Sequence, residues 1–210
     1  MNTKLSTKER IVEEALTLFS VNGYNGTSVK NIADAVGIKD SSIYKHYKSK
    51  REIVDAIVVR MKEKMSRMSS DIGLPQDEDT ETMAAAYGNL TVEELQALSR
   101  KVFLFYLQDD YMSRFWRFAT MEQYCDADIY DIYRDIFFEQ SIAYQKALFS
   151  EMIRQGTFVS GDAEIMAMNY YTPIFFLLSK YAGQKDRTEE ALQLLDRQVA
   201  EFYRIYNKKN

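Results

Sequence analysis

The sequence predicts a nearly all-helical protein, and three observations support that fold class. Glycine and proline are scarce, with 8 and 2 among 210 residues, so strands joined by tight turns are not expected. Apolar residues recur at intervals of three and four along most of the chain, which is the spacing of one helix face. Ser-x-x-Glu and Thr-x-x-Glu sequences precede several of these stripes, and such capping boxes mark helix starts.

Three helices are expected in the N-terminal part. A capping box opens the first helix, and Gly23 ends it. Thr27 or Ser28 caps a short second helix that ends at Gly37, and a third short helix covers about 40–47. Two short helices joined by a glycine-containing turn and packed on a longer first helix are typical of a helix-turn-helix.

The remainder is expected to form a larger helical domain, so we predict two domains, 1–50 and 51–210. Residues 71–82 contain Gly, Pro and several acidic residues and are predicted to be a loop. Pro173 should kink the helix that contains it. Six further helices are expected in this part, at about 49–68, 91–108, 110–124, 126–156, 162–183 and 188–206. With the first three, the chain is expected to contain about nine or ten helices in total.

Charge is distributed unevenly along the chain. Residues 1–65 hold 12 Lys/Arg and 8 Asp/Glu, a net charge of +4, whereas residues 66–210 hold 15 and 23, a net charge of −8. The overall charge of −4 excludes a basic protein that coats nucleic acid along its whole surface. The asymmetry favours a basic interaction module joined to an acidic body.

Three sequence features bear on the cellular compartment. Cys125 is the single cysteine, which excludes an intramolecular disulfide. No apolar run reaches the ~18 residues of a membrane span, and residues 1–8 lack the apolar core of a signal peptide. We therefore expect a cytoplasmic protein with no membrane partner.

Residues 37–50 carry the most informative pattern. Ile43 and Tyr47 are spaced to pack inward, which leaves hydrogen-bonding or cationic groups on the opposite face. These groups suit base edges and phosphates in a major groove: Ser41, Ser42, Tyr44, Lys45 and His46. Thr27, Ser28, Lys48 and Lys50 stand at helix starts, where free amides bind phosphate. Spacing alone leaves a capped helical hairpin with an ordinary solvated face equally open.

Residues 8–55 resemble the N-terminal domain of TetR-family transcriptional repressors. The specific part of the resemblance is a Gly-apolar pair, a few small or polar residues, and then apolar-Tyr-x-His-aromatic. The matching residues are Ile11, Ala15, Phe19, Gly23, Tyr24, Thr27, Ile32, Ala33, Val36, Gly37, Ile43, Tyr44, His46, Tyr47, Lys50 and Glu52. An all-helical remainder also suits this family.

The resemblance implies a homodimer that binds a near-palindromic double-stranded operator with two recognition helices in successive major grooves. Many family members have a small capping residue in place of Lys39 and a glycine in place of Ser41, which bears on the operator sequence. Asp40 is expected either to cap the recognition helix or to contact a base. DNA contacts are predicted at Thr27, Ser28, Lys39, Ser41, Ser42, Tyr44, Lys45, His46, Tyr47 and Lys50.

Aromatic residues are dense between residues 103 and 124, and such a stripe is more often core than pocket. The resemblance, however, implies a cavity here for a small-molecule effector, largely apolar with a few polar groups. Glu122 is a candidate counter-charge for a cationic ligand. The predicted lining residues are Met65, Met83, Tyr106, Trp116, Met121, Glu122, Tyr124 and Phe137.

The helix expected at 162–183 is apolar around nearly its whole circumference. Such a helix must be buried on all sides, and a subunit interface shared with the final helix explains this. The resemblance implies the same four-helix contact. The predicted interface residues are Met168, Tyr171, Phe175, Phe176, Leu178, Leu195, Val199 and Phe202.

The sequence therefore predicts a ligand-responsive DNA-binding regulator that the effector releases from its operator. We expect a repressor, and the sequence leaves activation open. A helical scaffold that recruits a partner through residues 162–206 would explain the apolar helix but not the pattern in 37–50. An all-helical enzyme is the less favoured alternative. We find no nucleophile–base pair, metal cluster or Gly-rich phosphate loop, so no catalytic residue, metal or cofactor is expected.

Overall fold

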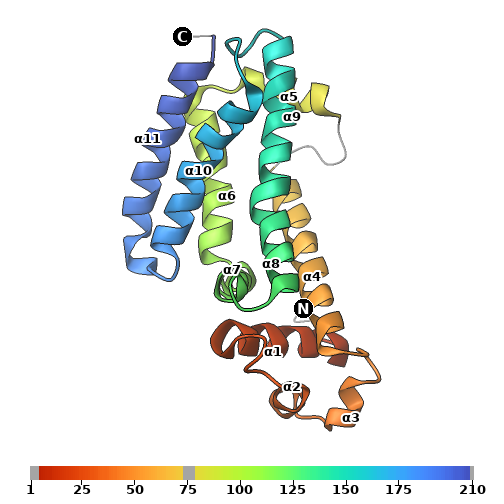
Figure 1. Ribbon diagram of the computed structural model, residues 1–210. Helices are drawn as coiled ribbons and strands as arrows, with labels where there is room; N and C mark the ends of the chain where they lie inside the picture. Colours follow the sequence, from red (N-terminus) through yellow and green to blue (C-terminus); the bar gives the residue numbers. More distant parts are fainter. Residues whose placement is uncertain (1–4, 73–78, 209–210) are drawn as a thin grey trace. The chain divides into compact units, whose positions relative to one another are not determined.

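The computed structural model describes residues 5–72 and 79–208, and within these ranges the secondary structure is helical apart from one isolated bridge between Phe158 and Asn207 (Figure 1). The predicted all-helical class is confirmed. The chain divides into two units, which we describe separately. The first unit comprises residues 1–66 and 110–133, and the second comprises 67–109 and 134–210.

The first unit is built around α1, which buries one stripe of apolar side chains against its neighbours. Phe19 is fully buried in α1 and stacks on Phe118 of α7 with ring centroids 5.3 Å apart. Burial of each such side chain contributes about 1.5–3 kcal/mol relative to exposure. The helices of this unit are α1 (Thr7–Asn22), α2 (Val29–Val36), α3 (Asp40–Ile43), most of α4 (Lys50–Asp71), α7 (Asp110–Glu122) and all but the last residue of α8 (Ala127–Arg134).

Local capping signals set most helix starts in this unit. The Ser6–Glu9 capping box forms as predicted, and Ser28 rather than Thr27 caps α2, with Asn31 completing the box. Gly37 ends α2 in the left-handed region with φ 75°, a conformation that costs glycine little. The helix predicted at 40–47 is shorter, because after Ile43 the chain continues as turns.

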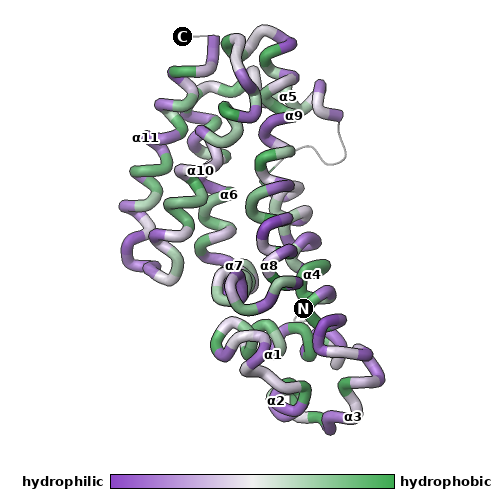
Figure 2. Tube along the Cα trace, viewed as in Figure 1, coloured by the Kyte–Doolittle hydropathy of each residue, from purple (hydrophilic) through white to green (hydrophobic). Residues whose placement is uncertain are grey.

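The second unit is a bundle in which α10 lies beside α6, α9 and α11, and α5 packs on α9 (Figure 1). Hydrophobic and hydrophilic residues alternate along α11 (Figure 2). Its buried stripe includes Leu195, Val199 and Phe202. The helices are α5 (Thr80–Asn89), α6 (Val92–Gln108), the π-helical turn η1 (Asp135–Glu139), α9 (Gln140–Arg154), α10 (Ala163–Tyr181), the 3₁₀ turn η2 (Lys185–Arg187) and α11 (Thr188–Tyr206).

α5 corrects the predicted loop at 71–82, of which 73–78 lie outside the described residues. The Asp79 carboxylate accepts from the Thr82 N–H at 2.8 Å and caps the helix. Met83 and Ala84 are buried. The signal was missed because this short helix has a narrow apolar stripe and begins among acidic residues that are common in loops.

The single helix predicted at 126–156 is three consecutive segments, because η1 interrupts it between α8 and α9. The start is as expected: Asp126 accepts from the N–H groups of Asp128 and Ile129. The Ser141 hydroxyl donates to the carbonyl of Ile136, five residues earlier, at 3.1 Å. A π-turn is a small insertion into helical geometry, so apolar spacing alone does not reveal it.

Pro173 lies inside α10. A proline removes the hydrogen bond to the carbonyl four residues earlier, which here belongs to Asn169. That carbonyl instead accepts from the side-chain amide of Gln198 in α11 at 3.2 Å. The freed acceptor is thus satisfied by a neighbouring helix.

Candidate nucleic-acid interface

The candidate site is the α2–turn–α3 segment and the turns that follow it. Ile32, Ala33 and Val36 bury one face of α2. Gly37 redirects the chain, and the N–H of Ile38 returns to the carbonyl of Ala33 at 3.0 Å. These contacts fix where α3 begins. Arg10 of α1 also donates to the carbonyl of Val36, the last residue of α2.

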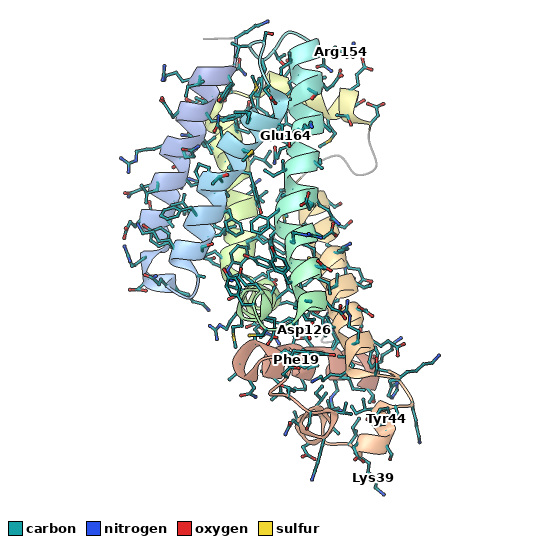
Figure 3. All side chains as sticks on the ribbon, in the orientation of Figure 1. Phe19, Lys39, Tyr44, Asp126, Arg154 and Glu164 are labelled. Atoms are coloured by element: carbon teal, nitrogen blue, oxygen red, sulfur yellow. The ribbon has the colours of Figure 1, made fainter. Side chains whose placement is uncertain are left out.

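Ile43 anchors α3 in the core, with 1% of its surface exposed. Lys39, Ser41, Tyr44 and Lys45 are exposed around it, and Figure 3 shows Lys39 extending away from this domain. Ser42 and His46 are half-buried, and the N-cap Ser28 is exposed. The structure therefore gathers most of the predicted contact residues on one short, solvent-facing segment.

Asp40 is the first residue of α3, after the N-cap Lys39, and its carboxylate accepts from the N–H of Ser41 at 2.7 Å. The carboxylate thereby interacts with the positive end of the short helix.

Tyr47 and Thr27 correct two predicted phosphate contacts. Tyr47 is 4% exposed, and its hydroxyl donates to the carbonyl of Lys8 at 3.4 Å. Burial raises the pKa of Tyr47. Thr27 is 1% exposed, and its hydroxyl donates to the carbonyl of Gly23 at 2.9 Å. Both side chains hold the domain together instead of facing a ligand.

Lys50 is a third correction. Its ammonium group donates to the carbonyls of Tyr24 at 2.6 Å and Thr27 at 2.9 Å. It also lies 4.0 Å from the centre of the Tyr24 ring, in the geometry of a cation–π contact. Burial lowers the pKa of Lys50. This lysine ties the start of α4 to the α1–α2 turn and is not a free phosphate contact.

The capping box predicted at the start of α4 forms only in part. The Ser49 hydroxyl accepts from the N–H of Glu52 at 3.1 Å, but the Glu52 carboxylate accepts from the N–H of Lys48 rather than that of Ser49.

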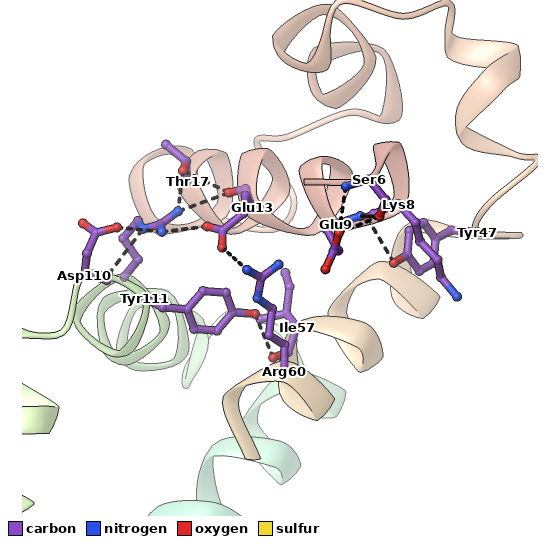
Figure 4. A network of polar contacts seen from close by, with 11 residues as sticks. Ser6, Lys8, Glu9, Glu13, Thr17, Tyr47, Ile57, Arg60, Asp110 and Tyr111 are labelled. Atoms are coloured by element: carbon purple, nitrogen blue, oxygen red, sulfur yellow. Dashed lines mark hydrogen bonds and ion pairs between the residues drawn. The ribbon is translucent and has the colours of Figure 1, made fainter. Parts of the chain in front are cut away.

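A charged network joins α1, α4 and α7 behind the candidate site (Figure 4). The Glu13 carboxylate contacts Arg60 and Arg114, each at 2.8 Å. Arg114 also donates to the Thr17 hydroxyl at 2.7 Å. Tyr111 lies between these cations, and its hydroxyl donates to a carbonyl of α4 at 3.0 Å. Hydrogen bonds to charged groups are about twice as strong as neutral ones, so this network stiffens the support of the helix-turn-helix.

The predicted effector-pocket residues fall in both units. Met121 and Tyr124 are 41% and 89% exposed, so they are corrected as lining residues. Glu122 is 4% exposed, but it accepts from the N–H of Tyr24 at 2.7 Å; its carboxylate serves the fold and is corrected as a ligand counter-charge. The remaining members are buried or half-buried: Met65 and Trp116 in the first unit, and Met83, Tyr106 and Phe137 in the second.

The predicted interface residues divide by exposure. Met168 and Phe176 are 47% and 60% exposed on α10, and Tyr171 and Phe175 are half-buried. Four others pack inside the second unit and are corrected, since their side chains are not at the surface: Leu178, Leu195, Val199 and Phe202. α10 is therefore buried on one side only within this chain.

Within residues 5–72 and 79–208, every helix is too short or too polar to span a membrane. Among the same residues, no three His, Cys, Asp or Glu side chains are grouped as metal ligands.

α3 is a short polar helix that follows α2 after a turn at Gly37, and α2 packs on α1. This arrangement defines a helix-turn-helix domain. Residues 11–57 match the family described as bacterial regulatory proteins, tetR family. The chain is 45% identical over 51 residues to the biofilm operon icaADBC HTH-type negative transcriptional regulator IcaR of Staphylococcus aureus. The Staphylococcus epidermidis regulator of the same name is 48% identical over 46 residues. These matches span 24% and 22% of this chain, and only 27% and 25% of the relatives.

Solved structures match over nearly the whole chain. The SmeT–triclosan complex has a TM-score of 0.69 at 18% identity and covers 98% of this chain and 94% of that one; SmeT is described as the repressor of the Stenotrophomonas maltophilia multidrug efflux pump SmeDEF. GusR of Salmonella enterica has a TM-score of 0.66 at 19% identity, covering 97% and 98%. At such identities these likenesses show the fold. The chain is thus similar in sequence to tetR-family regulators over residues 11–57, and similar in fold to SmeT and GusR over nearly its whole length.

Proposed function

We propose that the protein is a DNA-binding transcriptional regulator, acting as a repressor, with residues 1–50 as the DNA-binding domain and 51–210 as the effector-binding and dimerisation domain. The observation that supports DNA binding best is the exposure of Lys39, Ser41, Tyr44 and Lys45 around a buried Ile43. Side chains of this reach and chemistry suit a major groove. Ser28, Ser42 and His46 complete the proposed contact set.

The proposed partner in solution is a second copy of the chain, which gives two recognition helices for a near-palindromic operator. The support is the exposed apolar surface of α10, where Ile165, Met168 and Phe176 are 52%, 47% and 60% exposed. Adjacent large apolar side chains at the surface mark an interaction site. The charge separation along the sequence fits a basic DNA-facing module.

The proposed effector is a small, largely apolar molecule. Related structures are titled as complexes with triclosan, for SmeT, and with choline, for a regulator from Saccharomonospora viridis. In this chain Tyr106 is the polar candidate among the half-buried predicted lining residues, because its hydroxyl can donate or accept a hydrogen bond. Release follows if the effector binds better to the conformation with low operator affinity.

Binding to duplex DNA at several salt concentrations tests the proposal. A duplex selected by the full-length protein from a random-sequence pool should bind with an affinity whose logarithm falls linearly with the logarithm of salt concentration. A scrambled duplex of the same length should show the same trend at about a thousandfold or more lower affinity. Absence of duplex affinity at low salt would contradict DNA binding.

A further inference from the structure

The turn between α1 and α2 is held by charged groups from two other helices of the same unit. On one side, Glu122 at the end of α7 accepts from the N–H of Tyr24 at 2.7 Å. On the other side, the Lys50 ammonium of α4 donates to the Tyr24 carbonyl at 2.6 Å. A carboxylate thus binds the donor of Tyr24 and an ammonium binds its acceptor, so both charges are matched to the local backbone dipoles.

This turn determines where α2 starts. The N–H of Thr27 bonds back to the carbonyl of Tyr24 at 3.3 Å, and the Thr27 hydroxyl bonds to the carbonyl of Gly23 at 2.9 Å. Ser28, the N-cap of α2, follows directly. A shift of the Tyr24 peptide would therefore move Ser28 and α2, and α2 is the helix that leads into α3.

Gly23 is fitted to the carboxylate. A Cβ on this residue would lie 2.7 Å from Glu122 Oε1, closer than real Cβ contacts allow. Its φ of 76° and ψ of 169° also fall in a region that is almost restricted to glycine. The absence of a side chain at this position lets Glu122 reach the backbone.

Burial of the Glu122 carboxylate is energetically unfavourable, because the charge loses its hydration. Glu122 is 4% exposed, and Oε2 has no hydrogen-bond partner among the described residues. An apolar residue of similar volume would avoid the desolvation cost of a carboxylate. The Lys50 ammonium interacts favourably with this charge, but the direct hydrogen bond of Glu122 is to Tyr24.

We propose that Glu122 is a positioning residue for DNA recognition, which fixes the Tyr24 peptide and through it the α2–α3 segment. This inference rests on the proposed DNA-binding function. Glu122 would then not be the counter-charge of a ligand, as the sequence suggested. It would position the helix-turn-helix without touching either DNA or effector.

The test compares Glu122→Ala with Asp128→Ala in the full-length protein. Asp128 is an exposed carboxylate of the same unit, paired with Arg51 at 3.0 Å, so both variants remove one negative charge. Loss of that charge alone leaves DNA affinity equal or higher. We expect Glu122→Ala to bind the selected duplex about tenfold or more weaker than Asp128→Ala.

Hydrogen exchange of the Tyr24 amide provides a readout that does not require DNA. Exchange should quicken about tenfold in Glu122→Ala and stay unchanged in Asp128→Ala. Glu122→Gln keeps an acceptor of the same shape but a weaker, neutral one, so its exchange rate and affinity should lie between those of the wild type and Glu122→Ala. This conservative variant also carries the test if Glu122→Ala does not fold.

Unchanged Tyr24 exchange in either Glu122 variant would overturn the proposal, as would Glu122→Ala affinity no lower than that of Asp128→Ala. A wild-type protein without duplex affinity would instead contradict the proposed function, and Tyr24 exchange would still decide whether Glu122 holds the turn.

Discussion

Some polar side chains of the first unit form hydrogen bonds within the fold, and others are exposed to solvent. The residue type alone does not show to which group a side chain belongs. Lys45 and Lys50 are both lysines of the same basic segment. Lys45 is exposed, whereas Lys50 donates two hydrogen bonds to backbone carbonyls. Exposed cations contribute to phosphate binding, and a bound one contributes to stability. The same division separates exposed Tyr44 from buried Tyr47.

Lys50→Met and Lys45→Ala should therefore have different effects. Lys50→Met keeps the apolar stem but leaves two carbonyls without a charged donor. We therefore expect the free energy of unfolding to fall by about 1–3 kcal/mol. Lys45→Ala should leave the free energy of unfolding unchanged within about 0.5 kcal/mol. It should also lower the salt slope of DNA binding by about one for each phosphate that Lys45 neutralises.

Urea unfolding and duplex titrations at several salt concentrations measure both quantities. If Lys50→Met were as stable as the wild type and lowered the salt slope, Lys50 would contact phosphate after all.

At the scale of elements, close packing decides what a helix tolerates. α5 contains Gly88, which is buried although a helix interior normally disfavours glycine. A Cβ on Gly88 would lie 2.9 Å from Cγ2 and 3.2 Å from Oγ1 of Thr157. Thr157 is itself fixed, because its hydroxyl donates to the carbonyl of Met152 at 2.9 Å. Glycine here permits the close approach of α5 to the end of α9.

Gly88→Ala should therefore destabilise the protein despite the better helix propensity of alanine. The propensity gain is about 1 kcal/mol, but overpacking costs about 1–3 kcal/mol, so we expect a net decrease in stability in thermal or urea unfolding. Thr157→Ser removes the nearer methyl and keeps the hydroxyl, and the double variant should recover part of that decrease. A more stable Gly88→Ala would show that the two segments can separate without cost.

At the scale of the whole molecule, the net charge of −4 conceals +4 in residues 1–65 and −8 in residues 66–210. A net acidic protein can bind DNA when its cations are concentrated in one segment. In a dimer two such segments would be present. The surface that would join the two copies lies on α10, where apolar side chains remain exposed in the single chain.

Phe176→Glu should convert dimers into monomers in sedimentation experiments. A buried carboxylate without a partner is strongly unfavourable at an interface, and removal of a central aromatic residue costs about 2 kcal/mol or more. Val21→Glu is the matched control, because Val21 of α1 is 64% exposed and Phe176 is 60% exposed. An unchanged dimer in Phe176→Glu would place the interface elsewhere.

The sequence by itself determined the helical class, most helix starts and the exposed polar segment around α3. These features depend on residues within about four positions of one another, such as Ser6 with Glu9 or Thr91 with Glu94. It missed α5 and the π-turn η1, whose local signals are weak or depart from regular spacing.

Only the tertiary structure decided which polar side chains serve the fold. Glu122 meets Tyr24 across 98 residues of sequence and Lys50 meets Tyr24 across 26, and no local pattern encodes such contacts. The same holds for Thr27 and Tyr47, which are polar in type but buried by packing. A short-range pattern can thus identify a helix-turn-helix, whereas the long-range contacts that position it appear only once the helices have packed.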